Sequence, residues 1–153
     1  MDEFESFFSE SYGEVLRTVA LVLRDSERAQ DVTQEAFTRA FRRWRSVKAM
    51  ERPQGWVIVV AINADRRRWQ REPPAEPLEG GSGRIVEDHA GSVVTSVSVY
   101  EALDRLTMRQ RASVVLRYLS DLPVSDIAQA LGCAEGTVRA TLHQSLAKLR
   151  VDL

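Results

Sequence analysis

The sequence predicts an all-α protein of two small helical domains joined by a flexible linker, in which the C-terminal domain is a helix-turn-helix. Along most of the chain, apolar residues recur at steps of three and four, which is the spacing of one helix face. Near the middle, a stretch rich in proline, glycine, serine and acidic residues interrupts that pattern. Near the C-terminus, two short helical patterns flank a glycine. We therefore expect domains at residues 1–72 and 97–153 and a linker at 73–96.

The first domain begins with two helical segments. The apolar spacing predicts one or two amphipathic helices between residues 2 and 24, and Gly13 marks a possible break between them. Asp25 or Ser26 is a suitable N-cap for the next helix, because both side chains can accept a hydrogen bond from a free backbone N–H. We expect that helix to end near Ser46.

A third helix is predicted from Pro53 to about Arg71, because proline fits the first turn of a helix. Residues 57–60 are all β-branched and would also suit a buried strand. No partner strand is predicted nearby, and an isolated strand is not stable. The pattern therefore favours a helix here.

The second domain contains four more helical patterns. One resumes at about Val97, another runs from Met108 to Leu119, and two lie between Ser125 and Leu149. The last two form the predicted helix-turn-helix over residues 124–144.

Residue types at the constrained positions of this motif fit its geometry. Ile127 and Leu131 give the first helix a buried stripe, and Ala128 is small where two helices cross closely. Gly132 stands in the turn, where a positive φ costs a glycine little.

The second helix of the motif has an apolar side at Val138, Leu142, Ser145 and Leu149. If that side is buried, the opposite side faces outward and would enter a DNA major groove. Arginine can bond guanine there, glutamine can bond adenine, and alanine can contact a thymine methyl. We predict that the DNA-reading residues are Arg139, Ala140, His143 and Gln144. A helical hairpin used only for protein contact is the alternative.

Charge is distributed unevenly, although the formal net charge is only −1. Residues 39–71 hold ten lysines and arginines against two acids, and residues 105–150 hold seven against three. The segment between them, 72–104, has seven acids and one arginine. Two basic blocks indicate phosphate binding. Solvated helix faces would explain either block alone equally well.

Composition places the chain in a class and excludes others. Hydrophobic residues make up 44% and charged residues 28%, which is ordinary for a globular protein. The longest apolar run, residues 57–62, is too short for a bilayer, and the acidic N-terminus does not have the order of a signal peptide. The single cysteine, Cys133, suits a reducing compartment. We expect a cytoplasmic protein without a membrane segment.

Enzymatic chemistry is not indicated. The two histidines, His89 and His143, have no metal-ligand spacing, and there is no glycine-rich phosphate loop. We expect no catalytic residue, no metal site and no cofactor. A free-standing repressor is another alternative, but no dimerisation helix is evident, and it would leave the first domain unexplained.

Three segments carry a family resemblance. AQDVTQEAF (29–37) and PQGWVIVVAINADRRR (53–68) resemble regions 2.2 and 2.4 of extracytoplasmic-function sigma factors, which are group 4 of the sigma-70 family. Residues 106–150, from LTMRQ to AKLR, resemble their region 4. The resemblance implies a sigma factor that binds core RNA polymerase and directs initiation at promoters through −10 and −35 recognition. It also implies region 2 at 1–72 and region 4 at 97–153.

The resemblance implies partners as well as DNA contacts. Asp31, Gln34 and Glu35 match positions that meet the coiled coil of the polymerase's largest subunit, and region 4 would meet the flap of the second-largest subunit. A solvated polar face is the alternative for the three residues. Promoter DNA is the other partner, and an anti-sigma factor is possible.

Asn63 matches the region 2.4 position associated with the −10 element. The resemblance and the basic helix end around it give a −10 set of Val47, Met50, Asn63, Arg66, Arg67 and Trp69. In this set the arginines would hold phosphates, and Trp69 could stack on a base. The loop with Val47 and Met50 corresponds to the segment that captures a flipped base, where relatives carry an aromatic residue. Trp44 and Trp56 are expected in the core.

Region 4 departs from the common SEGTVKSRLHRA pattern. This chain has Ala134, Arg139, Ala140, Thr141 and Gln144 at the varied positions. The missing hydroxyl and two missing basic groups predict a different −35 preference with fewer phosphate contacts.

Overall fold

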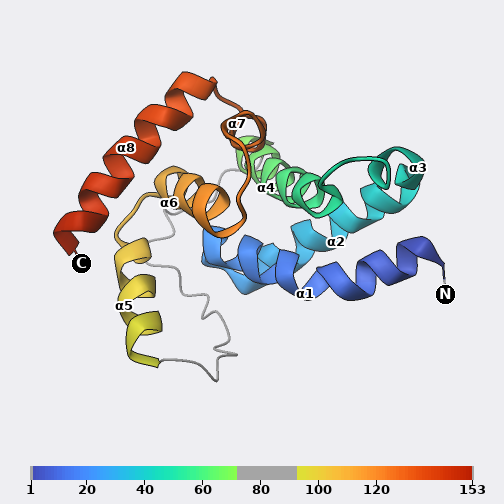
Figure 1. The fold of residues 1–153 in the computed structure, drawn as a ribbon, viewed down its shortest axis with the longest axis horizontal. Helices are drawn as coiled ribbons and strands as arrows, with labels where there is room; N and C mark the ends of the chain where they lie inside the picture. The colour runs from blue at the N-terminus through green and yellow to red at the C-terminus, as the bar shows by residue number, and fades with distance from the viewer. Residues whose placement is uncertain (1, 72–92, 153) are drawn as a thin grey trace.

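The computed structural model describes residues 2–71 and 93–152. These residues form helices and no strand, as the sequence predicts (Figure 1). In chain order the helices are α1 (Glu3–Leu23), α2 (Ser26–Arg42), α3 (Trp44–Val47), α4 (Pro53–Arg71), α5 (Val93–Asp104), α6 (Met108–Val114), η1 (Val115–Leu119), α7 (Val124–Leu131) and α8 (Glu135–Asp152). Most of the predicted linker lies outside the described residues, and its last four residues belong to α5.

Helix α1 is continuous, so the possible break at Gly13 is not present. Asp2 caps its N-terminus by accepting from the backbone N–H of Phe4, and Arg24 ends it in the left-handed conformation. The apolar residues that follow the glycine on one side of the helix, including Val15 and Val19, are buried. Their burial outweighs the roughly 1 kcal/mol that a glycine costs in a helix interior.

Helix α2 starts at the predicted cap, because the Asp25 carboxylate accepts from the Arg28 backbone N–H at 3.1 Å. The predicted single helix to Ser46 is in fact two, since α2 ends at Arg42 and the short α3 follows it. Helix α4 begins at Pro53 and ends at Arg71, as predicted. Burial of Val57 and Ile58 against α1 and α2 overrides their β propensity.

The first three long helices build the core of the N-terminal half. Valine, isoleucine and alanine side chains of α1, α2 and α4 fill it. Near the N-terminus of α1, the packed side chains are aromatic, and the centroids of neighbouring rings lie 5.1–6.4 Å apart. The rings belong to Phe4, Phe7, Phe8, Tyr12, Phe37, Phe41 and Trp44. This cluster fixes α3 against the start of the chain.

The C-terminal half consists of α5, α6, η1 and the helix-turn-helix. A capping box between Thr107 and Gln110 starts α6. The predicted helix 108–119 is α-helical only to Val114 and then widens into the π-helical η1. Gly132 ends α7 with a φ of +66°, as expected for the turn.

The two halves lie against each other and share one hydrophobic cluster. Helix α4 packs on α7, and α1 packs on α6 and η1 (Figure 1). The sequence pattern predicts two separate lobes and does not indicate this contact.

Arg111 of α6 bridges the halves. Its side chain is only 8% exposed and donates to the backbone carbonyl of Val22 at 2.8 Å and to that of Leu106 at 3.1 Å. Burial, helped by the nearby charge of Arg24, lowers the pKa of Arg111 to about 10. The guanidinium therefore stays charged at neutral pH, and it is compensated by the backbone carbonyls that it bonds and by the nearby charge of Asp104.

Candidate nucleic-acid interface

Helix α8 presents the predicted reading face to solvent. Val138, Leu142 and Ser145 are buried on its inner side. The four predicted −35 residues are all exposed on the outer side: Arg139, Ala140, His143 and Gln144. An exposed ion pair of 3.3 Å with Glu135 orients Arg139 along the helix. Such a pair contributes little stability, so the guanidinium is available for a base.

The first helix and the turn of the motif agree with the sequence prediction. Ile127, Ala128 and Leu131 are buried. Thr141, one of the varied region 4 positions, is also buried, and its backbone carbonyl accepts from the Ser145 hydroxyl at 2.6 Å. Its side chain therefore lies in the core and not on the reading face.

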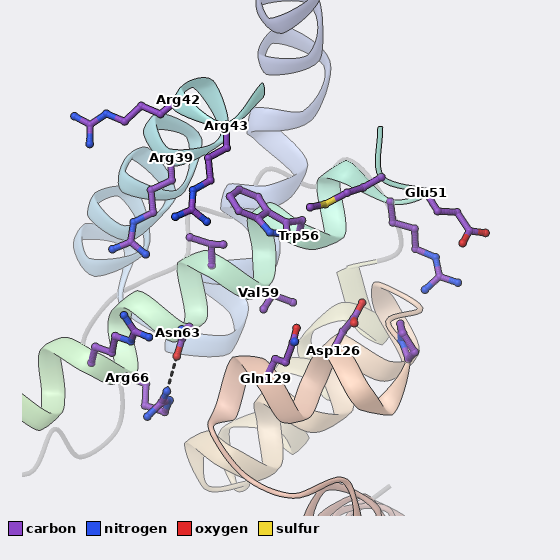
Figure 2. A pocket seen from close by; sticks show the side chains of 15 residues that line it. Arg39, Arg42, Arg43, Glu51, Trp56, Val59, Asn63, Arg66, Asp126 and Gln129 are labelled. Carbon is purple, nitrogen blue, oxygen red and sulfur yellow. Dashed lines mark hydrogen bonds between the residues drawn. The ribbon is translucent and has the colours of Figure 1, made fainter. Parts of the chain in front are cut away.

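A second basic surface is a cleft of about 960 Å³ between α2, α4 and α7 (Figure 2). Its walls carry two acids, Glu51 and Asp126, and six arginines: Arg39, Arg42, Arg43, Arg52, Arg66 and Arg67. Among the described residues, the side chains of four of these arginines make no hydrogen bond or ion pair: Arg42, Arg43, Arg52 and Arg67. The cleft thus has an excess of uncompensated positive charge, which suits a polyanion.

The cleft also has an apolar floor. Trp56, Val59 and Met50 line it, and Met50 is 38% exposed. The expectation that Trp56 is a core residue is therefore only half right, since its half-buried ring packs on the core and also lines the cleft. A planar base could lie on this floor while arginines hold its phosphates.

Asn63 and Arg66 are already engaged with each other. The Arg66 Nη2 donates to the Asn63 Oδ1 at 2.5 Å, as the dashed line in Figure 2 shows. Both side chains are half-buried in the cleft wall, and Arg67 beside them is exposed. Three of the four predicted residues of α4 thus line one cleft, and the fourth, Trp69, does not.

Val47 does not belong to this surface. Its side chain is 0% exposed, because it ends α3 and packs into the core below the loop that follows. The buried side chain of Val47 does not support the prediction that it contacts DNA. Met50, three residues later, is the member of the predicted pair that reaches the cleft.

Trp69 lies at the end of α4 with one ring face covered. The guanidinium of Arg28 lies 4.5 Å from the centre of its indole ring. Arg28 is held in turn by a bidentate ion pair with Asp65, at 2.6 and 3.0 Å, and Asp65 is only 1% exposed. A base could stack only on the opposite ring face.

The predicted polymerase-binding residues lie together on α2. Asp31 and Gln34 are exposed and Glu35 is half-buried. Arg68 of α4 lies 3.7 Å from a carboxylate oxygen of Asp31 and 3.7 Å from one of Glu35. The sequence pattern does not indicate this cross-helix link, because it depends on how α2 packs against α4.

Within the described ranges, no cluster of three metal-ligating side chains occurs. No helix in those ranges is long and apolar enough to cross a membrane.

An exposed recognition helix and an arginine-lined cleft on an all-helical chain define a DNA-binding protein of the helix-turn-helix class. Comparison with known proteins identifies the family. Residues 7–72 match Sigma-70 region 2, and residues 96–149 match Sigma-70, region 4.

Relatives along the whole chain agree with these matches. An RNA polymerase sigma-E factor of Streptomyces coelicolor is 31% identical over 99% of this chain and 86% of its own length. An ECF RNA polymerase sigma factor SigM of Mycobacterium tuberculosis is 33% identical over 95% of this chain and 74% of its own length. The fold is similar to that of the sigma factor RpoE from Bartonella quintana, solved with the anti-sigma factor NepR, with a TM-score of 0.75, 18% identity and coverage of 99% and 97% of the two chains.

The chain belongs to the extracytoplasmic-function sigma factors of the sigma-70 family. It directs promoter-specific transcription initiation together with core RNA polymerase. Sigma factors are known not to be catalytic enzymes.

Proposed function

We propose that the two basic surfaces read two parts of one promoter. Residues 1–72 act as region 2 and recognise and melt the −10 element, and residues 97–153 act as region 4 and recognise the −35 element. Residues 73–96 link them. The observation that carries the proposal is the arginine-lined cleft with Asn63 in its wall, because that combination suits an unstacked base with its phosphates.

In the −10 cleft, charge and stacking have separate tasks. Arg66 and Arg67 hold phosphates, Asn63 forms hydrogen bonds with the edge of a base, and Met50 and Trp56 provide an apolar surface for its ring. Capture of an extruded base offsets the few kcal/mol that unstacking costs, so binding itself drives melting.

At the −35 element, the outer face of α8 enters a duplex major groove. Arg139 is suited to guanine and Gln144 to adenine, while Ala140 fits against a thymine methyl. His143 lies on the same face and extends it toward the C-terminal end of the helix.

The proposed protein partners follow from the family. Asp31, Gln34 and Glu35 contact the coiled coil of the polymerase's largest subunit, and region 4 contacts the flap of the second-largest subunit. An anti-sigma factor is a further partner, supported by the anti-sigma complex of the structurally similar RpoE. We propose that the chain acts in the cytoplasm, without catalytic residues or a cofactor.

Reconstitution with core polymerase tests this proposal. The holoenzyme is used to select promoters from a random library, and open complexes are then measured with permanganate footprinting. Asn63→Ala should reduce open complexes while core binding remains, because the substitution removes a base contact and not a polymerase contact. Asp31→Ala should weaken core binding instead. The site assignment fails if Asn63→Ala melts every selected promoter as well as the unchanged chain does.

A further inference from the structure

Trp69 is linked to two charged residues that the proposed DNA contacts do not use. Its ring stands in the last turn of α4, and α4 lies side by side with α2 (Figure 1). The guanidinium of Arg28, on α2, lies 4.5 Å from the centre of that ring. Arg28 also binds the carboxylate of Asp65, which precedes Trp69 by about one turn of α4. The three side chains therefore form one continuous set of contacts between the two helices.

The geometry of these contacts is fixed. The Arg28 Nε donates to Oδ1 of Asp65 at 3.0 Å and its Nη2 donates to Oδ2 at 2.6 Å, so one edge of the guanidinium is bound at two points. Asp65 is only 1% exposed, and a buried carboxylate without its cation would be strongly unfavourable. Because the guanidinium is planar, binding its edge also fixes its position over the indole of Trp69.

The indole of Trp69 is not part of the core. Among the described residues, the hydrophobic cluster includes the half-buried rings of Trp44 and Trp56 but not that of Trp69. A purely structural role, in which Arg28 and Asp65 join α2 to α4, explains the ion pair but not the large ring beside it. The face of the ring away from Arg28 is the one available to a base, and aromatic faces stack on bases of any sequence.

Trp69 also lies within reach of a strand bound in the cleft. Asn63 is six positions earlier on α4, which is about 9 Å along the helix axis. Arg66, between them, is a neighbour of both on the helix surface, because it is three positions from each. A single strand that contacts Asn63 can therefore continue to Trp69.

We propose that Arg28 and Asp65 are positioning residues for −10 DNA, on which they act through Trp69. The inference rests on the proposed −10 function. Asp65 holds Arg28, and Arg28 holds the indole in one orientation as a stacking surface for an unstacked base. Because the ring is ordered before DNA arrives, binding does not have to supply the free energy of ordering it. Neither charged residue touches the base.

Removing both charges together tests the proposal without leaving a buried charge unpaired. Arg28→Met with Asp65→Leu, the neutral pair, replaces the ion pair with apolar side chains of similar size. The matched control is Arg24→Met with Asp104→Leu, because it removes another arginine–aspartate pair beside an aromatic ring, that of Tyr100. Each chain is assembled with core polymerase on a promoter selected by the unchanged chain. The lifetime of the open complexes is then measured after addition of competitor DNA.

Trp69→Ala should shorten the open-complex lifetime about tenfold, because the stack on a base is lost. The neutral pair should shorten it about threefold, because the ring remains but is no longer ordered, and the control should match the unchanged chain. In chains that already carry Trp69→Ala, the neutral pair should have no further effect. An unchanged lifetime in the neutral pair, or an equal loss with and without Trp69, would overturn the proposal.

Arg28→Lys separates positioning from charge pairing, and it also serves if the neutral pair does not fold. Lysine keeps a cation for Asp65 but has no planar fork to fix the ring, so the same threefold loss is expected. In the free chain with Trp44→Phe and Trp56→Phe, which leaves Trp69 as the one tryptophan, Arg28→Lys should increase acrylamide quenching of the emission. Full recovery of the lifetime with lysine would show a structural pair and overturn the proposal, as would unchanged quenching.

The two proposals fail separately. If Trp69→Ala leaves the open-complex lifetime unchanged, Trp69 does not belong to the −10 contact, and the positioning role fails with it. If Trp69→Ala shortens the lifetime while the variants of Arg28 and Asp65 do not, only the positioning role fails.

Discussion

The two halves of this sigma factor present their proposed DNA-binding faces in opposite ways. In the C-terminal half, all four predicted reading residues of α8 are exposed. In the N-terminal half, Asn63 and Arg66 lie in a cleft wall that the other half covers. The two surfaces therefore differ in availability because of the elements packed around them. The free chain is expected to meet duplex DNA more readily than a single strand.

The halves also differ in how their buried charged side chains are compensated. The N-terminal half pairs the buried carboxylate of Asp65 with the partly buried guanidinium of Arg28. The C-terminal half buries Arg111 and satisfies it partly with the Val22 carbonyl of the other half. The first half is thus internally compensated, whereas the second depends on its partner.

The largest expected effect comes from breaking that compensation. Arg28→Met leaves the carboxylate of Asp65 buried without a cation and should cost about 3–5 kcal/mol of unfolding free energy. Urea unfolding followed by circular dichroism measures the loss. Combining it with Asp65→Leu should recover most of the stability, because no buried charge then remains. A single variant that loses less than the double variant would contradict the account of a compensated half.

The next largest effect is expected on DNA binding by the exposed face of α8. Arg139→Ala should weaken binding of the free chain to a selected −35 duplex by about 1–3 kcal/mol, since a bidentate base contact is lost. A gel shift without polymerase measures this. Arg150→Ala, on the exposed end of the same helix, is the matched control for lost charge. Equal losses in the two variants would mean that Arg139 contributes charge and not sequence reading.

A smaller effect on stability is expected where the turn at Gly132 contacts Arg66. Gly132→Ala should cost about 1–2 kcal/mol through its positive φ alone. In this structure the new methyl group also meets the Arg66 guanidinium, so combining Gly132→Ala with Arg66→Ala should cost less than the sum of the single losses. Thermal unfolding of all four chains measures this coupling. Strict additivity would show that the turn and Arg66 are apart in solution.

The smallest effect concerns the ion pair at the edge of the contact. Swapping the charges with Arg24→Asp and Asp104→Arg should change the unfolding free energy by under about 1 kcal/mol, because Asp104 is half-exposed and water screens the pair. Either single reversal should be worse than the swap. Chemical unfolding at low and high salt checks this, and the difference should shrink at high salt.

Sequence reasoning was most successful where a local rule determines structure. The Asp25 cap, the start of α4 at Pro53 and the outward face of α8 all follow from hydrogen-bonding needs or helical spacing within one segment. The β-branched residues of α4 were also assigned correctly, because an isolated strand has no partner.

Errors occurred where a residue's environment comes from distant elements. The sequence places Val47 in a loop, yet it is the last residue of α3 and its side chain is buried in the core. The guanidinium of Arg28 lies over the ring of Trp69, 41 positions further along the chain. The contact between Arg66 and Gly132 joins the two halves. Helical spacing shows which side of a helix is buried but not which element buries it, so the packing of the two halves on each other could not be predicted.

The positions of the tryptophans have a practical consequence. All three stand at positions 44, 56 and 69, in the N-terminal half, and Trp56 lines the cleft that α7 covers. Withdrawal of α7 would admit water around the Trp56 indole and move its emission to longer wavelength. The fluorescence emission of Trp56 should therefore report on the contact between α4 and α7 without an added label. Stopped-flow mixing with polymerase would show whether and how fast that emission changes.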